Sequence, residues 1–140
     1  SDLERLVCNL PQADLDKPYR TGGWTIRQVV HHLPDSHLHA YSRFKMSLTL
    51  DNPTISPYPE AAWAELPDGR EGPIDDSLDL LKGVHARWVR CLQHMSESDW
   101  KRTYFHPEHQ RTFVLDETLG GYVWHGRHHI GHIKNALNDE

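Results

Sequence analysis

The chain has 140 residues, which is enough for one domain, residues 1–140, with a single core. Its formal net charge of −5 argues against a general nucleic-acid-binding protein. We find no apolar stretch of the roughly 18 residues that a membrane span needs and no secretory leader, so we expect a cytoplasmic protein without membrane association. The two cysteines, Cys8 and Cys91, lie far apart in the sequence and fit free thiols better than a disulfide framework.

Two helices are predicted in the first 50 residues. Apolar residues at helical spacing over residues 3–10, ended by a proline, indicate a short first helix. Thr25 and Gln28 then have the spacing of a capping box, and apolar positions recur at helical spacing from there to about residue 50. Pro34 lies inside this second helix, where it should kink the helix or loosen the turn before it.

Residues 51–76 contain five prolines and read as a long ordered loop between the second and third helices. Long loops in compact domains are usually functional or mobile. Tyr58 and Trp63 supply apolar surface that can dock the loop on the helices, and a short helical turn is expected around residues 60–66.

Two more helices complete the expected fold. The third begins with Asp75 or Asp76 as its cap and runs to about Met95. Residues 102–114 look extended on both sides of a turn, which suggests either a small hairpin or an irregular excursion. Asp116 is expected to cap the last helix, which runs to roughly Leu137. The sequence therefore predicts an all-α protein, an up-and-down four-helix bundle with a long proline-rich loop between helices 2 and 3.

Histidine is the unusual feature of the composition, with 12 residues against 15 lysines and arginines. In the last helix His125 and His129 are four residues apart and therefore share a face, and His132 extends the same stripe along the border of the apolar face. Such a pair can grip a divalent metal ion, and a third ligand from another helix would leave a coordination position open. A packed histidine cluster without metal is the alternative that the spacing leaves open.

The third ligand should come from the histidines at 31–39 in the second helix. Helical periodicity leaves both His32 and His37 as candidates. Asp35 could orient a ligand histidine by accepting its second ring N–H, or could be an acid that faces solvent.

Other common active sites are not indicated. Glycine follows His125 where a zincin has its glutamate, and Ser36 beside Asp35 lacks the surroundings of a nucleophilic serine. The phosphate-binding and dinucleotide-binding glycine motifs are also absent from the sequence.

Two long motifs carry a resemblance to a known family: GGWTIRQVVHHLPDSH at residues 22–37 and YVWHGRHHIGHI at residues 122–133. In these motifs, and in their order and separation, the sequence resembles the DinB/YfiT-like metalloproteins, in particular the YfiT branch of metal-dependent hydrolases and bacillithiol S-transferase-like proteins. The resemblance implies a four-helix bundle in which three histidines hold Zn or Ni. It selects His32 over His37 as the ligand from the second helix, and His125 and His129 as the ligands from the last.

The sequence departs from the family pattern in two places. Pro34 stands where the branch usually has a small helix-forming residue, so that His32 or Asp35 could be shifted slightly. The N-terminal region also looks shorter, so part of the first helix could be missing. Neither departure removes a ligand.

The expected function is that of a metal-dependent hydrolase or thiol S-transferase with an open position for water or thiolate. Asp35 and Arg43 are the candidate catalytic residues, and Tyr58 and Trp63 are further candidate substrate contacts. The expected partner is a small molecule, such as a low-molecular-weight thiol, and the family habit suggests a homodimer.

Two other functions stay open from the sequence. A non-catalytic bundle with a structural metal would need a fourth protein ligand, for which His37, His132 or an acidic residue could serve. A histidine cluster without metal would instead respond to pH.

Overall fold

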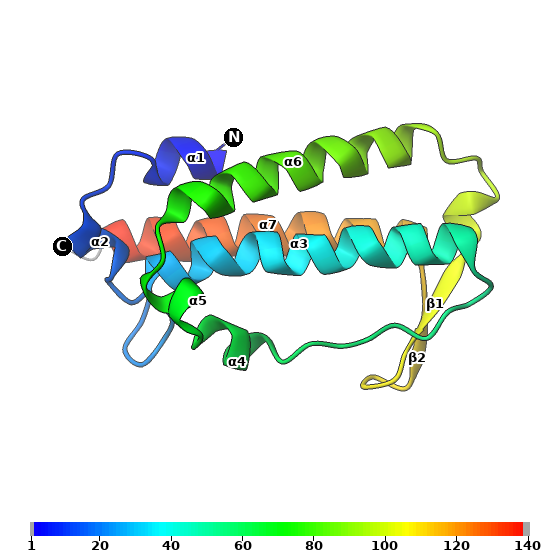
Figure 1. Cartoon of the computed structure of the whole chain (residues 1–140), viewed down its shortest axis with the longest axis horizontal. Helices are drawn as coiled ribbons and strands as arrows, with labels where there is room; N and C mark the ends of the chain where they lie inside the picture. Colours follow the sequence, from blue (N-terminus) through cyan, green and yellow to red (C-terminus); the bar gives the residue numbers. More distant parts are fainter. Residues whose placement is uncertain (1, 139–140) are drawn as a thin grey trace.

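Three long helices run along most of the molecule in the computed structural model, which describes residues 2–138 (Figure 1). They are α3 (Ile26–Thr49), α6 (Ile74–Gln93) and α7 (Leu115–Asn138). The short helix α1 (Asp2–Val7) packs against them at the end of the molecule that holds the C-terminal part of α7. These four helices confirm the predicted four-helix bundle.

The order of helix directions differs from a simple up-and-down arrangement, because α3 and α6 run parallel (Figure 1). Residues with higher numbers in α3 contact residues with higher numbers in α6, as expected for parallel helices. The pairs are His31 with Ser77, His37 with His85, and Phe44 with Trp88. Helix α7 runs in the opposite direction. The reason is the long connection after α3, which returns along the bundle before α6 begins, whereas a short turn would have made the two helices antiparallel.

This returning connection is ordered and carries two short helices, α4 (Glu60–Ala64) and α5 (Pro67–Glu71). Helix α4 confirms the expected turn around residues 60–66, whereas α5 was not predicted. Side chains of α3 fix the connection in place: the Gln28 amide donates to the Ala64 carbonyl at 2.8 Å, and the Arg27 guanidinium donates to the Gly72 carbonyl at 2.9 Å. Gln28 and Arg27 are buried, and a buried polar group without a hydrogen bond would destabilise the fold. These two hydrogen bonds avoid that loss of stability.

Local sequence signals explain where α3 begins. The Thr25 hydroxyl accepts from the backbone N–H of Gln28 at 3.1 Å, and the Gln28 side chain accepts from the Thr25 N–H at 3.0 Å. This is the predicted capping box. The helix continues through Pro34, whose buried ring packs inside the bundle.

The starts of the other two long helices differ slightly from the prediction. Pro73 precedes α6, and Leu115 is already the first residue of α7. Asp75, Asp76 and Asp116 therefore lie within the first turns and do not cap the helices. Carboxylates in this position still interact favourably with the positive end of the helix dipole.

A small hairpin separates α6 from α7, as expected for residues 102–114. Strands β1 (Thr103–His106) and β2 (Arg111–Val114) are antiparallel, and His106 is paired with Arg111 at the turn end. The short elements α2 (Gln12–Leu15) and η1 (Asp99–Lys101) complete the described chain.

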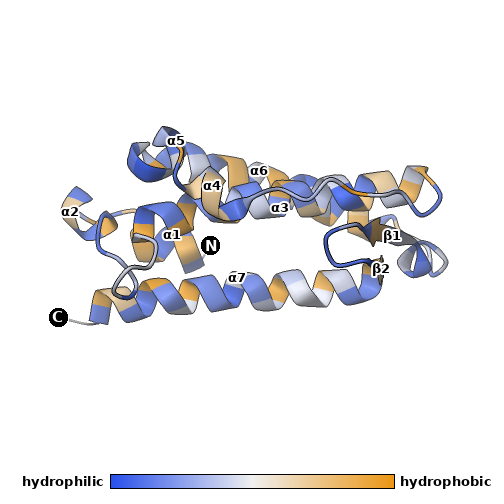
Figure 2. Ribbon diagram, turned by 90° about the horizontal axis from the view of Figure 1, so that it is seen from below, coloured by the Kyte–Doolittle hydropathy of each residue, from blue (hydrophilic) through white to orange (hydrophobic). Residues whose placement is uncertain are grey.

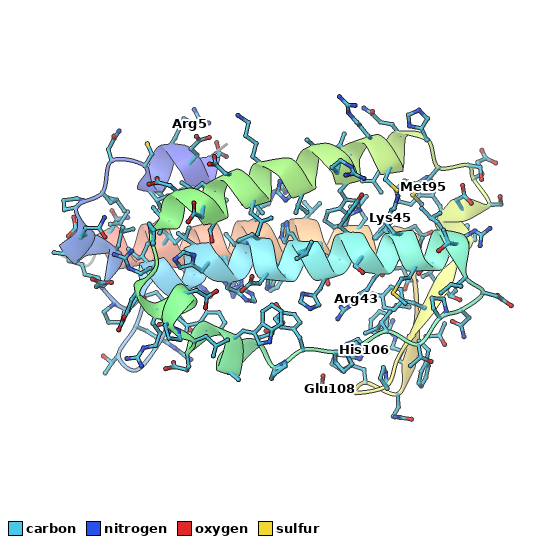
Figure 3. The ribbon with its side chains drawn as sticks, viewed as in Figure 1. Arg5, Arg43, Lys45, Met95, His106 and Glu108 are labelled. Carbon is cyan, nitrogen blue, oxygen red and sulfur yellow. The ribbon has the colours of Figure 1, made fainter. Side chains whose placement is uncertain are left out.

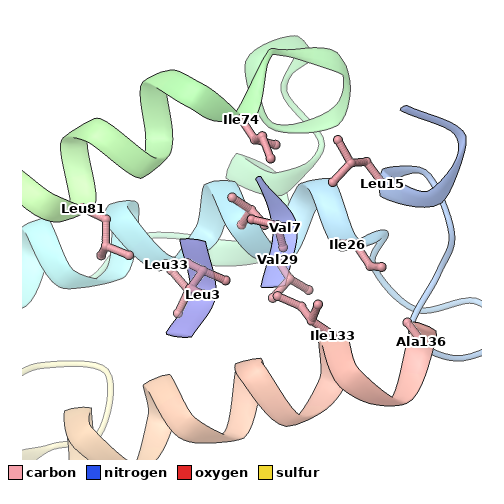
Figure 4. Packing of buried hydrophobic residues seen from close by; sticks show 11 residues of the cluster. Leu3, Val7, Leu15, Ile26, Val29, Leu33, Ile74, Leu81, Ile133 and Ala136 are labelled. Atoms are coloured by element: carbon pink, nitrogen blue, oxygen red, sulfur yellow. The ribbon is translucent and has the colours of Figure 1, made fainter. Parts of the chain in front are cut away.

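Apolar side chains form two clusters along the bundle. The first lies where α1 meets the long helices (Figure 4) and contains Leu3, Val7, Leu15, Ile26, Val29, Val30, Leu33, Ile74, Leu81, Ile133 and Ala136. The second lies towards the hairpin and contains Ala40, Phe44, Ile55, Trp88, Tyr104 and Leu115. Apolar and polar residues alternate along the helices (Figure 2), and no helix within residues 2–138 is long and apolar enough to cross a membrane.

Candidate metal centre

Three imidazoles from two helices meet between the two apolar clusters. His32 comes from α3, and His125 and His129 come from successive turns of α7. Their ligand atoms all lie within 4.8 Å of one another. The His125 Nε2 atom lies 3.5 Å from His32 Nε2 and 2.9 Å from His129 Nε2. These are the three residues that the family resemblance implies as ligands, and the fold brings them together.

The local sequence explains this convergence. A spacing of four residues places His125 and His129 one above the other on α7, and their ring centroids are 4.3 Å apart. The His32 ring enters from the opposite helix with its centroid 4.9 Å from that of His129. Trp24, just before α3, packs against His32 with a centroid distance of 4.9 Å and covers one side of the cluster.

Burial keeps these rings neutral at pH 7. Desolvation, and then the neighbouring His125, lowers the pKa of His32 to about 4. Desolvation also lowers the pKa of His129 to about 3, with further contributions from the surrounding histidines, and it lowers the pKa of His125. A neutral imidazole is the form that binds a metal ion, so the cluster is ready to coordinate without first losing a proton.

The donor set and spacing fit a divalent transition metal. With bonds of about 2.0–2.1 Å to imidazole nitrogen, tetrahedral coordination separates ligand nitrogens by roughly 3.3–3.4 Å. The His32–His125 separation of 3.5 Å is close to this value, and the shorter His125–His129 separation is that of a hydrogen bond between two rings. An ion would replace that hydrogen bond with two coordination bonds.

The remaining ring nitrogens of the α7 pair have no protein acceptor. The Nδ1 atoms of His125 and His129 are buried without a hydrogen-bond partner among the described residues. Metal-bound histidines usually donate from the second nitrogen to a carboxylate, a carbonyl or water. Asp35 was the candidate for this role, but no hydrogen bond joins its carboxylate to the three histidines in residues 2–138.

Asp35 instead faces the returning connection. Burial and the neighbouring Asp68 raise its pKa, while His31 and His39 act in the opposite direction. Its side chain therefore belongs to the surface between α3 and α5 in this structure. The predicted orienting role of Asp35 is not found here.

The other histidines near the cluster have separate contacts. His132 stacks on Tyr19 with centroids 4.5 Å apart, and His128 is exposed and stacks on Trp124. His37 is hydrogen-bonded to His85 of α6, with 2.6 Å between His37 Nδ1 and His85 Nε2. Within the described chain, neither His37 nor His132 belongs to the group of converging ligand atoms.

A cavity of about 780 Å³ reaches the cluster from the hairpin side. His125 forms part of its wall, together with Arg43 and Tyr58, two of the predicted substrate contacts. Trp63 is not part of the wall. It packs against Tyr58, and both rings contact His39 of α3, which holds the returning connection over the helix.

Several cavity residues were not identified from the sequence as candidates. Among them are Glu60 of α4, His106 of β1 and Tyr122 of α7. The Arg43 guanidinium donates to the Tyr122 hydroxyl at 3.2 Å. Glu60, His106 and Tyr122 each come from a different element, so no shared spacing joins them in the sequence, although Tyr122 begins the motif at residues 122–133.

Comparison with known proteins agrees with this geometry. The sequence model of the DinB superfamily matches residues 1–133. A protein of Bacillus mycoides and one of Bacillus anthracis, both named as candidate metal-dependent hydrolases, are each 50% identical over 133 residues, covering 95% of this chain and 76% of the relative.

A solved structure is also similar. YfiT from Bacillus subtilis, described as a probable metal-dependent hydrolase with an unusual four-helix bundle topology, superimposes with a TM-score of 0.94 at 46% identity. The match covers 96% of this chain and 77% of YfiT. With the three-histidine cluster in place, these matches show that the chain belongs to the DinB superfamily.

Proposed function

We propose that this protein is a metal-dependent enzyme that acts on a small molecule, as a hydrolase or as a thiol S-transferase. His32, His125 and His129 would hold one divalent ion, Zn or Ni. The observation that carries the proposal is the convergence of these three imidazoles at the end of a cavity large enough for a small molecule.

The number of ligands favours catalysis over a purely structural role. Structural zinc sites are usually closed by four protein ligands, whereas catalytic sites keep a position for water or substrate. Only three donors converge in the described chain, and the next nearest histidines have other partners. When bound, the ion would lower the pKa of water or of a thiol at the open position.

The protein's own residues would position the substrate. Trp24 and the buried start of α3 restrict access of water to one side of the cluster, and the cavity admits the substrate from the other. Arg43 and Tyr58 would contact the substrate from the helix and from the returning connection. Because the α7 ligands lie on adjacent turns of one helix, their relative position is fixed before an ion binds.

One experiment separates the two activities. Protein purified without a nickel column and loaded with Zn or Ni is offered activated esters and amides in one series, and low-molecular-weight thiols with an electrophile in the other. Turnover in one series, lost in His129→Ala and kept in His132→Ala, would identify the reaction class. Equal background rates in all three proteins would contradict the enzymatic proposal.

The alternative is a non-catalytic bundle that holds a structural metal. It would require a fourth protein ligand, and the partly buried His132 of α7 would have to leave Tyr19 to supply it. A homodimer is also part of the proposal, and sedimentation analysis of the untagged protein tests it.

A further inference from the structure

Arg43 is a partly buried cation that forms no ion pair among residues 2–138, although the Glu60 carboxylate is a charged neighbour. Its side chain extends from α3 into the space between this helix and the hairpin (Figure 3). Its Nη1 atom donates to Tyr122, but its Nε atom is buried without a partner, and no carboxylate in residues 2–138 forms an ion pair with it. Withdrawing a charge from water is unfavourable unless it is paired, so an anionic ligand would stabilise this arrangement.

His106 supplies a second donor at the same end of the cavity. The residue is 93% buried, and its Nδ1 atom accepts from the backbone N–H of His109 at 3.4 Å. A neutral ring that accepts at Nδ1 carries its proton at Nε2. Burial, together with the neighbouring His109 and Arg43, lowers the pKa of His106 and so favours this neutral form.

We propose that Arg43 and His106 bind the carboxylate of the substrate while its reacting group lies at the three-histidine cluster. Both residues and His125 line one cavity, so a single small molecule can reach the two ends. That the bound carboxylate belongs to a substrate rests on the proposed function, whereas the binding of a carboxylate by Arg43 and His106 does not depend on it.

The charges around the cavity favour a single negative charge. Arg111 forms an exposed ion pair with Glu117 at 3.8 Å, whereas the partly buried Arg43 forms no ion pair with a carboxylate among residues 2–138. Glu60 and Glu108 also line this cavity and would repel a doubly charged group such as a phosphate monoester. A carboxylate, which carries one negative charge, fits this site, because the Arg43 guanidinium and the neutral His106 ring can both donate hydrogen bonds to it.

The cavity wall favours a carboxylate attached to an apolar body. Tyr58, Tyr104, Phe113 and Tyr122 contribute aromatic surface between the two ends. The Tyr104 and Phe113 rings are stacked with centroids 5.5 Å apart, which gives this part of the wall a rigid flat surface. A small aromatic carboxylate such as benzoate is therefore a suitable probe.

The test measures benzoate, benzamide and phenyl phosphate binding to the metal-loaded protein by calorimetry. Arg43→Met should weaken benzoate binding about ten- to a hundredfold, the range for loss of a charge-assisted contact, and should leave benzamide binding unchanged. Arg111→Met is the matched control, because Arg111 lines the same cavity but is paired with Glu117, and it should change benzoate affinity less than about twofold. Glu60→Gln should strengthen benzoate binding.

A second experiment distinguishes benzoate binding at Arg43 and His106 from direct binding of benzoate to the metal ion. Benzoate should still bind His129→Ala, whose three-histidine cluster is broken, and should shift the Nε2 resonance of His106 in both proteins. His106→Asn, checked for native unfolding temperature, should also weaken benzoate binding.

Equal benzoate affinity in wild type and Arg43→Met, loss of binding in His129→Ala, or tighter binding of phenyl phosphate than of benzoate would each overturn the inference. None of these three results would by itself remove the proposed metal-dependent function. Conversely, normal benzoate binding by a protein that takes up no metal would refute the proposed function and leave the carboxylate site intact.

Discussion

Replacing His129 by alanine removes one of the three converging donors and should weaken metal binding strongly. Zinc sites in small proteins contribute about 10–16 kcal/mol in total, so that one of four donors contributes about 3 kcal/mol, roughly a hundredfold in affinity. The remaining pair, His32 and His125, has nitrogens 3.5 Å apart and could still hold an ion weakly.

His132→Ala is the matched control, because this histidine lies on the next turn of α7, with its ring centroid 5.6 Å from that of His129, but stacks on Tyr19 and contributes no atom to the group of converging ligand atoms. Competition with a fluorescent zinc chelator measures both affinities, and elemental analysis measures the metal content of protein purified without a nickel column. The ligand assignment would be refuted if His129→Ala kept wild-type affinity, or if His132→Ala lost as much as His129→Ala.

Three further predictions follow from burial and charge. Removal of the metal with EDTA should lower the melting temperature, because an ion at 100 times its dissociation constant contributes about 2.7 kcal/mol; melting that is insensitive to EDTA would favour a histidine cluster without metal. Burial, and then the neighbouring His85, lowers the pKa of His37 from 6.5 to about 4. Between these two pH values the ring therefore stays neutral in the folded protein, whereas in the unfolded chain it binds a proton. The free energy of unfolding of the metal-free protein should therefore fall as pH drops from about 6.5 towards 4, and His37 should contribute about 1.4 kcal/mol per pH unit to this fall. In His37→Leu the dependence of the unfolding free energy on pH should be less steep by that amount. Equal pH dependence in wild type and His37→Leu would exclude a buried neutral His37. Phe44→Ala removes a ring with no exposed surface and should lower the free energy of unfolding by about 3–5 kcal/mol in urea titrations, whereas a loss below 1 kcal/mol would contradict the packing of the second apolar cluster.

Local chemistry made the main helices predictable from the sequence. The capping box at Thr25 and Gln28 depends on four consecutive residues, and the His125–His129 pair depends only on helical spacing, so neither needs knowledge of the tertiary structure. Helix α5 was missed because its proline and glycine read as loop. In the structure Pro67 occupies the first helical turn, where it needs no N–H donor.

The features that depend on long-range packing were not predictable in the same way. The parallel course of α3 and α6 follows from where the connection docks, which Gln28 and Arg27 determine through carbonyls far away in the sequence. Periodicity left His32 and His37 as equal candidates, and the family resemblance was needed to choose between them. The hydrogen bond between His37 and His85 explains the choice physically, because it turns the His37 ring towards α6.

Asp35 illustrates the limit of inference from helix position. The sequence left it either as a carboxylate that orients a ligand histidine or as an acid that faces solvent. In the structure α5 packs against α3, and its Asp68 is a charged neighbour of Asp35. Arg43, predicted as a catalytic residue or substrate contact, lines the cavity, and that role stays a prediction. Its hydrogen-bond partner Tyr122 and the neighbouring cavity residue His106 come from elements distant in the sequence.

The most direct test of the central claim is X-ray absorption spectroscopy of untagged protein loaded with one equivalent of zinc. The three-histidine site predicts one tightly bound ion per chain, three imidazole nitrogens at about 2.0–2.1 Å and one exchangeable oxygen from solvent. In His129→Ala one imidazole should be lost from the spectrum. Four protein ligands, or a protein that binds no stoichiometric metal, would contradict an open catalytic site formed by His32, His125 and His129.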